Sequence, residues 1–319
     1  MNGPNGAMLI QEVSPRDGLQ IEPRWIETAD KVHLINALSL AGFSRIEAGS
    51  FVSAKAVPGL CDGADVFAAI KRRPSTVYVA LVPNRKGAER ALAARADEVN
   101  FVMSASETHN LANTRMRQAD SLSALGDVVA LVHGSGITVN ATIATAFGCP
   151  FEGEQPDEKI LGLVRCYLDH AVDGVTLADT TGMANPVQVA KLVSAALSQV
   201  PTEHLTLHFH NTRGLGLVNV LAAYQAGARR FDASLGGLGG CPFAPGATGN
   251  VCTEDLVNLC HETGIETGLD LSALITLSRD LPKLVGHEVP GQIAKAGGTA
   301  DLHPAPPNYR PPNTGGPGY

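Results

Sequence analysis

Two histidines one residue apart, His208 and His210, carry the clearest chemical signal in this chain of 319 residues. They follow the apolar run that begins at Leu205, which predicts a buried strand over Leu205–Phe209. Side chains at positions i and i+2 of a strand share a face, so both imidazoles point the same way. Two neutral imidazoles on a rigid strand suit a divalent metal ion. The alternative interpretation is a pair of polar side chains satisfied by neighbours where the strand ends.

Two oxygen donors elsewhere in the chain could complete such a site. Asp17 offers a carboxylate just after an apolar run near the N-terminus, and Asn250 offers an amide oxygen. Two nitrogens, two oxygens and water describe a six-coordinate Mg, Mn or Co site rather than a tetrahedral zinc site. Arg16 adds a positive charge, so the pocket would bind an anionic substrate and stabilise a developing oxyanion. Taken alone, Arg16 and Asp17 could equally form a simple ion pair.

Cys241 lies in a glycine-dense stretch, whereas a buried and inert thiol is expected on a helix or strand. One interpretation is a mobile loop with an incidental cysteine. The other is a lid that brings a thiol, with an ordinary pKa of about 8.5, over the metal as an acid. Glu47 and Asp179 stand at the ends of two predicted strands. They could orient metal ligands, or they could only satisfy backbone donors there.

These residues need a scaffold that brings them together, and the chain alternates β-branched runs with longer amphipathic stretches in units of roughly 30 residues. Eight strands are predicted: Leu9–Val13, Arg45–Ala48, Val77–Val82, Glu98–Met103, Thr138–Ile143, Gly174–Leu177, Leu205–Phe209 and Arg230–Ala233. The helical patterns include Asp30–Leu40, Arg85–Ala94, Asp157–His170, Pro186–Gln199, Leu217–Ala226, Thr253–Thr263 and Leu271–Val285.

This alternation predicts an α/β fold, a closed (β/α)8 TIM barrel with an additional C-terminal helix. Continuous apolar runs such as Val77–Val82 indicate a sheet covered on both faces. An open doubly wound sheet is the alternative, but neither Gly214–Gly216 nor Gly237–Gly239 completes a dinucleotide-binding fingerprint. Chemistry in a TIM barrel lies at the carboxyl ends of the strands, which is where the polar residues named above fall.

We expect one barrel domain over residues 8–296, with the helical extension included. It would stand between a disordered N-terminus over residues 1–7 and a disordered tail over residues 297–319. The tail is dense in Pro and Gly and cannot bury a core.

Composition narrows the class of partner and the compartment. Lys and Arg total 24 against 31 Asp and Glu, for a net charge of -7, and no basic cluster indicates a nucleic-acid partner. Six scattered cysteines without a Cys-x-x-Cys pair indicate reduced thiols and a cytoplasmic protein. The first residues do not form a signal peptide and no apolar run could span a bilayer, so we expect no membrane association.

The sequence contains the motifs Arg16–Gln20, Ile46–Ala48, Gly148–Gly153, Asp179–Gly182, His208–His210, Gly236–Asn250 and Thr253–Leu256. Together they resemble 3-hydroxy-3-methylglutaryl-CoA lyases (HMG-CoA lyases), within a metal-dependent barrel superfamily that also contains isopropylmalate and homocitrate synthases. The resemblance runs from about Leu9 to Leu284. The His-x-His and Arg-Asp elements mark only the superfamily, whereas the stretch from Gly236 to Asn250 resembles the signature loop of the lyase branch.

The resemblance implies metal-dependent retro-Claisen cleavage of an HMG-CoA-type thioester to acetyl-CoA and a β-keto acid, acetoacetate. It implies Mg²⁺ or Mn²⁺ as the metal and an acyl-CoA substrate, in leucine degradation and ketone-body formation, with a homodimer possible. The implied catalytic residues are Arg16, Asp17, Cys241 as the loop acid, and His208, with Asp17 and His208 both candidates for the base. The implied metal ligands are Asp17, His208, His210 and Asn250, and the implied supporting residues are Gln20, Glu47, Asp179 and Glu254.

The chain departs from the family pattern at Asn211, where Asp is usual, at Thr145, where better-known lyases have Cys, and over Ser106–Asn110. These sites could line the pocket for the acyl group, so the sequence leaves open which acyl group the substrate carries. One rival is a lyase for another 3-hydroxy-acyl-CoA, such as a citramalyl-type thioester. A second is a synthase that joins acetyl-CoA to a 2-keto acid, a class that lacks the cysteine loop. A third is a catalytically silent barrel that binds an acyl-CoA or a protein.

Overall fold

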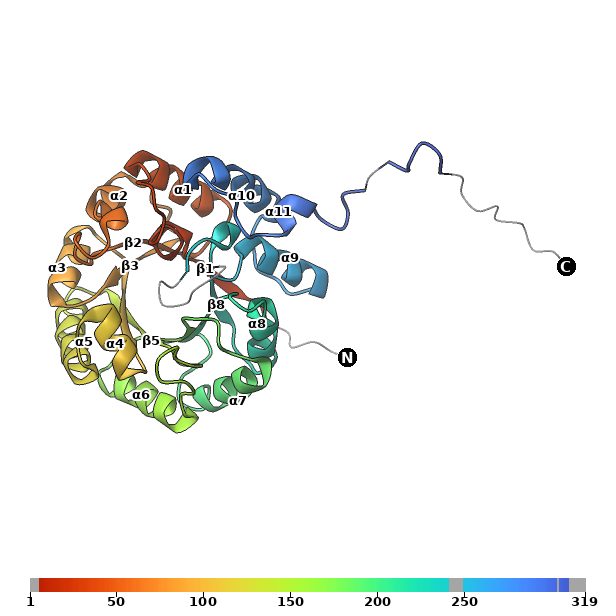
Figure 1. Cartoon of the computed structure of the whole chain (residues 1–319). Coiled ribbons are helices and arrows are strands. Elements are labelled where there is room, and N and C mark those ends of the chain that lie inside the picture. Colours follow the sequence, from red (N-terminus) through yellow and green to blue (C-terminus); the bar gives the residue numbers. More distant parts are fainter. Residues whose placement is uncertain (1–5, 241–248, 303, 310–319) are drawn as a thin grey trace.

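The computed structural model describes residues 6–240, 249–302 and 304–309. Eight parallel strands pair in sequence order and close into a barrel, because β1 pairs with both β2 and β8 (Figure 1). The strands are β1 (Leu9–Glu12), β2 (Arg45–Ser50), β3 (Val77–Val82), β4 (Glu98–Ser104), β5 (Thr138–Ala144), β6 (Gly174–Asp179), β7 (Leu205–Phe209) and β8 (Arg230–Ala233). The predicted TIM barrel is confirmed, and all eight predicted strands are present.

Helices form a ring around the barrel (Figure 1). They are α1 (Thr28–Leu40), α2 (Gly63–Ala69), α3 (Arg85–Ala93), α4 (Glu107–Thr114), α5 (Gln118–His133), α6 (Asp157–Asp169), α7 (Pro186–Ala196), α8 (Gly216–Gln225), α9 (Thr253–Thr263), α10 (Leu271–Val285) and α11 (Ile293–Ala296). Three short helical turns, η1 (Ser14–Gly18), η2 (Pro58–Leu60) and η3 (Leu235–Gly237), complete the list.

Four of these helices, α2, α4, α5 and α11, are additional to the expected ones. In α4 the cause is local, because the Ser106 hydroxyl accepts a hydrogen bond from the N–H of His109 at 3.0 Å. A serine that accepts from the third residue beyond it is an N-cap, and it begins a helix. The segment after β4 that differs from the family pattern is therefore mostly helical rather than a loop.

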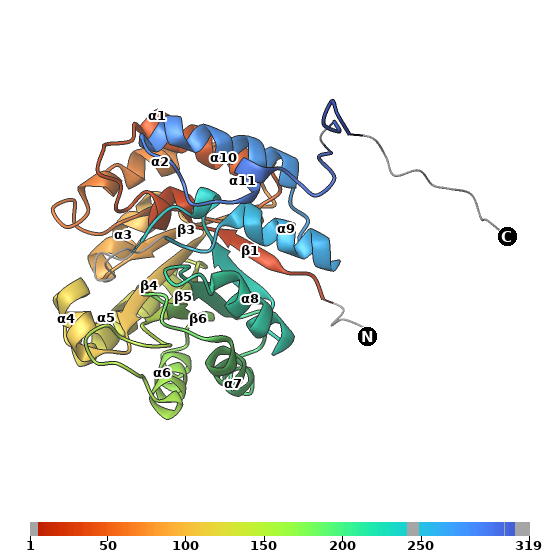
Figure 2. The same cartoon turned by 45° about the vertical axis from the view of Figure 1, so that its right-hand side comes forward.

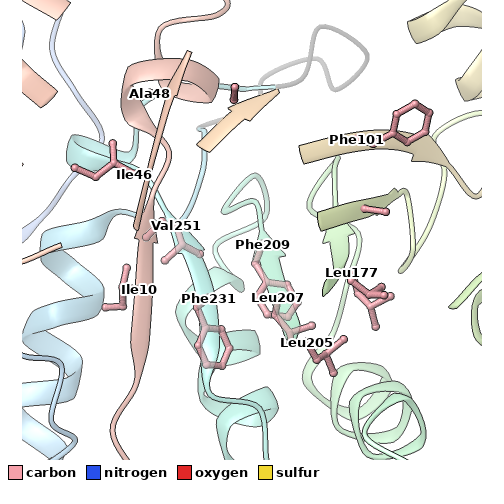
Figure 3. Close-up of a cluster of buried hydrophobic side chains, with 14 of the residues drawn as sticks. Ile10, Ile46, Ala48, Phe101, Leu177, Leu205, Leu207, Phe209, Phe231 and Val251 are labelled. Carbon is pink, nitrogen blue, oxygen red and sulfur yellow. The ribbon is translucent and has the colours of Figure 1, made fainter. Parts of the chain in front are cut away.

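The apolar core lies between the strands and the ring of helices. Leu207 on β7, Phe231 on β8 and Leu177 on β6 are fully buried on that outer side of the barrel (Figure 3). Such residues alternate with polar ones along most strands, as the two-residue period of a strand requires. Only β3 has apolar or aromatic residues at every position.

The other side chain of each alternating pair faces the barrel interior, which is largely polar. Asn140 of β5 donates to the Asn100 side chain on β4 at 3.0 Å and to Thr176 on β6 at 2.9 Å. Arg45 of β2 pairs with Glu98 of β4. Because buried polar groups must be hydrogen-bonded, this network fixes the strands in a single register.

The C-terminal helices close the ring. The helix α10 lies beside α1, although the two are far apart in sequence (Figures 1 and 2). The N–H of Asp270, the N-cap of α10, donates to the Ala41 carbonyl at 3.0 Å. Beyond α11, residues 297–302 and 304–309 form no helix or strand. Among the helices that the structure describes, none is long and apolar enough to cross a membrane.

Candidate active site

Asp17, His208 and His210 meet at the carboxyl ends of the strands. One ligand atom from each side chain lies within 4.8 Å of the other two, and the imidazole centroids are 5.1 Å apart. His210 is buried, while Asp17 and His208 are half-buried. Three side chains of these types at this separation can hold a divalent ion. The structure thus brings together three of the ligand candidates that the sequence indicated, and the fourth, Asn250, lies beside them.

The strand β7 presents both histidines because its side chains alternate. Leu207 and Phe209 face the core on the helix side, so His208 and His210 face the barrel axis. The strand ends at Phe209, and His210 continues the pairing as an isolated bridge with Asn250. The backbone N–H of residue 251 donates to the Phe209 carbonyl at 3.1 Å. This pairing brings Asn250 next to the two histidines.

Asp17 is presented by the tight turn η1, which follows β1 directly. The carbonyl of Val13 accepts hydrogen bonds from the N–H groups of Arg16, Asp17 and Gly18, at 3.1, 2.8 and 3.2 Å. A π-type turn of this kind is rare and is often found at functional sites. Glu12 braces the turn, because its Oε1 accepts from the N–H of residue 14 at 2.8 Å.

Asn250 is the fourth ligand candidate. Its Nδ2 donates to Asp17 Oδ2 at 2.8 Å and to the Leu238 carbonyl at 3.0 Å. Its Oδ1 is buried and has no hydrogen-bond partner among the described residues, and the same holds for His210 Nδ1. Buried polar atoms are normally paired, so an unpaired oxygen and an unpaired nitrogen next to the Asp17 carboxylate fit a bound cation.

Arg16 is buried between two carboxylates. Its Nη1 lies 2.5 Å from Asp17 Oδ1, and its Nε donates to Glu47 Oε2 at 2.6 Å. Burial alone would lower the pKa of Arg16, but the charges of Glu47 and Asp17 raise it above its ordinary value. The other oxygen of Glu47 accepts from Asn100 Nδ2 at 3.0 Å, and Gln20 Oε1 accepts from Arg16 at 3.4 Å. The guanidinium is therefore fixed from several sides.

The protonation states of Asp17 and His210 suit metal binding. Burial would raise the pKa of Asp17, but Arg16 and the two imidazoles lower it to about 2. Burial and the neighbouring His208 lower the pKa of His210 to about 3. Burial would lower the pKa of His208 as well, but its hydrogen bond to Asp232 raises it. An ionised carboxylate and a neutral imidazole are the forms that bind a metal ion.

Asp179 and Glu254, two carboxylates predicted to support the site, hydrogen-bond to groups other than the ligand candidates. Asp179 Oδ1 accepts from the N–H groups of residues 183 and 184 at 2.7 and 3.1 Å, and burial raises the pKa of Asp179 to about 6. Glu254 accepts from the N–H of Gly236 at 2.9 Å and from the Ser278 hydroxyl. Among the described residues, neither carboxylate is hydrogen-bonded to a ligand candidate. Their observed role is to fix backbone next to the site.

Asp232 is a residue that the sequence analysis did not single out. It lies on β8 and its Oδ2 is 3.1 Å from His208 Nδ1. The alternation of side chains on β8 could have identified Asp232 from the sequence. Arg230 and Asp232 share the inward face with Ser234, while Phe231 and Ala233 face the core. Cys241, the predicted loop acid, lies outside the described residues.

The site combines a divalent-cation centre with a fixed guanidinium. A cation bound by one carboxylate keeps part of its charge, and Arg16 adds another positive charge within contact of Asp17. Such a site can bind an oxyanion and stabilise negative charge that develops on an oxygen during a reaction.

Comparisons with known proteins agree with this chemistry. The family model described as HMGL-like matches residues 7–281. The hydroxymethylglutaryl-CoA lyase of Bacillus subtilis is 42% identical over 283 residues, 89% of this chain and 95% of that protein. The (R)-citramalyl-CoA lyase of Chloroflexus aurantiacus is 44% identical over 306 residues, 91% of this chain and 95% of that protein.

A solved structure is similar over nearly its whole length. The HMG-CoA lyase from Acinetobacter baumannii, in complex with coenzyme A and 3-methylmalate, superposes with a TM-score of 0.92 at 61% identity. The match covers 94% of this chain and 98% of that one. More distant barrels, such as the carboxyl transferase domain of Rhizobium etli pyruvate carboxylase at 17% identity, share the fold.

Proposed function

Because this chain belongs to the HMGL-like family, whose model matches residues 7–281, we propose that it cleaves 3-hydroxy-3-methylglutaryl-CoA to acetyl-CoA and acetoacetate. The protein is a carbon–carbon lyase, as are the relatives named above. The observation that supports the proposal most strongly is the cluster of Asp17, His208 and His210 next to the buried Arg16.

The metal centre of the proposal consists of Asp17, His208, His210 and Asn250, with Mg²⁺ or Mn²⁺ as the ion. The mixed donor set of two nitrogens and two oxygens and the unpaired Asn250 Oδ1 support this choice over zinc. Such an ion, when bound, acts as a Lewis acid that lowers the pKa of the substrate hydroxyl.

The residues of the chain account for the remaining steps of the cleavage. The tertiary hydroxyl loses its proton to a base, which we assign to His208 or Asp17. As the ketone forms, the carbon–carbon bond breaks and its electron pair passes to the thioester enolate. Arg16 donates hydrogen bonds to the thioester oxygen and offsets the enolate charge. Cys241 then gives its proton to the enolate carbon, which completes acetyl-CoA.

The role of Cys241 depends on the resemblance of residues 236–250 to the lyase loop, since this cysteine lies outside the described residues. Gln20, Glu47, Asp179 and Glu254 support the site through the contacts described above. We assign the reaction to leucine degradation and ketone-body formation in the cytoplasm, with an acyl-CoA thioester as substrate and a homodimer as the assembly. The six scattered cysteines support a reducing compartment.

The direct test is to incubate the purified protein with 3-hydroxy-3-methylglutaryl-CoA and to quantify acetoacetate. We expect formation with Mg²⁺ or Mn²⁺ and its loss when EDTA removes the ion. Wild-type protein that binds Mn²⁺ yet releases no acetoacetate would contradict the substrate, and activity unchanged by EDTA would contradict the metal.

A second candidate substrate is a citramalyl-CoA-type thioester. The support is the 44% identity to the (R)-citramalyl-CoA lyase. The similar structure also contains 3-methylmalate, a five-carbon hydroxydicarboxylate that is an isomer of citramalate. The two substrates differ in the acyl group beyond the reacting carbons, so the same centre could cleave either. A comparison of kcat/KM between them decides, and we expect 3-hydroxy-3-methylglutaryl-CoA to have the larger value.

A further inference from the structure

The imidazole of His208 is held by a buried carboxylate that has no role in the proposed chemistry. Its Nδ1 lies 3.1 Å from Oδ2 of Asp232, and only 12% of the His208 side chain and 6% of the Asp232 side chain are exposed. A carboxylate accepts hydrogen bonds and cannot donate them, so Nδ1 carries the proton in the neutral ring. Nε2 is then the nitrogen that can bind an ion.

The orientation of Asp232 is itself fixed by a chain of side chains across the barrel interior. Arg45 Nε donates to Gln11 Oε1 at 3.1 Å, and Gln11 Nε2 donates to Asp232 Oδ1 at 3.1 Å. Arginine has no acceptor, so the amide oxygen of Gln11 must face Arg45 and its NH₂ must face Asp232. Glu98 pairs with Arg45 and keeps the guanidinium in place.

We propose that Asp232 is a positioning residue that holds His208 in the Nδ1–H tautomer, with its acceptor direction set by Gln11 and Arg45. The inference rests on the proposed metal centre, because the tautomer matters only if His208 binds an ion through Nε2. Carboxylates that accept from a metal-binding histidine commonly fix its tautomer and strengthen binding. Asp232 acts through His208, and the proposal needs no contact between Asp232 and the substrate.

The hydrogen-bond directions make Asp232→Asn an informative variant. The Gln11 NH₂ demands an acceptor, so the new amide must place its oxygen toward Gln11 and its NH₂ toward His208. His208 Nδ1 must then accept, which moves the ring proton to Nε2 and blocks metal binding there. A substitution that changes almost no volume should therefore lower Mn²⁺ affinity about 10- to 100-fold, the usual effect of losing such a partner.

The same logic predicts a rescue. In Gln11→Glu combined with Asp232→Asn, the new carboxylate at position 11 accepts from Arg45 and from the amide NH₂ at position 232. The amide oxygen can then face His208 and restore the Nδ1–H tautomer. We expect the double variant to bind Mn²⁺ within about threefold of wild type, since the supporting hydrogen bond is restored. Gln11→Glu alone places two carboxylates face to face and should lower the melting temperature.

Three measurements test the proposal on the full chain. Calorimetry gives the Mn²⁺ affinity, the melting temperature of the metal-free protein reports folding, and long-range ¹H–¹⁵N NMR identifies the protonated ring nitrogen of His208. The matched control is Asp173→Asn, the same substitution at an exposed aspartate that pairs with His133 outside the site. It changes no side chain in contact with the ligand candidates, and we expect unchanged Mn²⁺ affinity.

The outcomes separate this inference from the proposed function. Weak Mn²⁺ binding by Asp232→Asn with an Nε2–H signal, reversed in the double variant, supports the inference. Wild-type affinity in folded Asp232→Asn overturns it, and so does an Nδ1–H signal in that variant. Should the single variant fail to fold, the double variant decides: near wild-type affinity supports the inference, and a large loss overturns it. Wild-type protein that binds no Mn²⁺ would instead refute the metal centre itself.

Discussion

At the scale of single residues, the candidate metal centre depends on which atom of each side chain is already engaged. The amide of Asn250 donates from Nδ2 to Asp17 and to the Leu238 carbonyl, so its buried oxygen remains for an ion. His208 is engaged at Nδ1 by Asp232. Each engaged atom leaves another donor atom of the same side chain for the ion, and a side chain that is already fixed loses less entropy on binding.

His210→Ala tests the ligand set. The variant removes one of two imidazole ligands, so we expect Mn²⁺ affinity to fall by more than the roughly 10- to 100-fold typical of a lost supporting residue. Calorimetry measures the change. The matched control is His204→Ala, which removes an exposed imidazole just before β7. Equal affinities in the two variants would exclude His210 from the centre.

Cys241→Ser tests the proposed acid. Serine keeps the shape of the side chain but is a much weaker acid than a thiol, so the protonation of the enolate should slow. We expect kcat to fall about 10²- to 10⁴-fold, the usual contribution of general acid catalysis, with Mn²⁺ affinity unchanged. Stopped assays of acetoacetate and calorimetry measure the two quantities. Near-normal turnover would remove the thiol from the mechanism.

At the scale of elements, two tight segments bring the ligands together. The turn η1 presents Asp17 directly after β1, and the bridge between His210 and Asn250 extends β7 by one pair. Glycine is needed where these segments touch. Gly239 has φ +98°, and a Cβ there would lie 2.6 Å from Asn250 Nδ2 and 2.9 Å from the Asp17 carbonyl oxygen.

Gly239→Ala should therefore displace Asn250 and Asp17. We expect Mn²⁺ affinity to fall about tenfold, comparable to the loss of a supporting residue. Gly136→Ala is the matched control, because Gly136 has φ +73° but no heavy atom lies within 4 Å of the new Cβ. It shares the backbone strain without the contact, so calorimetry should give wild-type affinity. A similar loss in both variants would attribute the effect to strain alone.

At the scale of the whole molecule, one buried carboxylate joins the first strand to the last elements of the barrel. Glu12 on β1 accepts from the N–H groups of Ser14 and Leu235 at 2.8 and 3.0 Å, and from the Thr253 hydroxyl at 2.7 Å. These partners belong to η1, η3 and α9. Burial raises the pKa of Glu12 from 4.5 to about 7.

This pKa makes stability depend on pH with a definite sign. Between pH 4.5 and about 7 the folded protein holds a proton on Glu12 that the unfolded chain has lost. The contribution of Glu12 to the free energy of unfolding is therefore full below pH 4.5 and is lost as the pH rises through 7. At about 1.4 kcal/mol per pKa unit, the loss is about 3 kcal/mol.

Glu12→Gln should remove this dependence. The neutral amide can accept from both N–H groups and donate to Thr253, as the protonated acid does. Relative to wild type, we expect the variant to gain stability by about 3 kcal/mol between pH 5 and pH 8, in urea unfolding at each pH. Glu89→Gln neutralises an exposed carboxylate on α3, and its free energy of unfolding should depend on pH in the same way as that of wild type. A constant difference between Glu12→Gln and wild type would contradict the assignment.

The sequence by itself determined the barrel and indicated the residues of the proposed ligand set. Period-two alternation and apolar runs located all eight strands, because burial on a strand imposes that pattern locally. The TIM-barrel rule then assigned Asp17 and the two histidines to one face. Residue types alone indicated the chemistry, since imidazoles with a carboxylate and an amide favour a divalent ion.

Only the tertiary structure decided which atoms meet. Asp232 lies 24 positions from His208 in sequence, and Arg45 lies 53 positions from Glu98, yet both pairs are in contact. Closure of the barrel brings the inward-facing side chains of different strands toward one axis. A local sequence pattern does not specify the register between strands or the distance between residues across that axis. In the same closed barrel, Asp179 and Glu254 accept hydrogen bonds from backbone N–H groups next to the site.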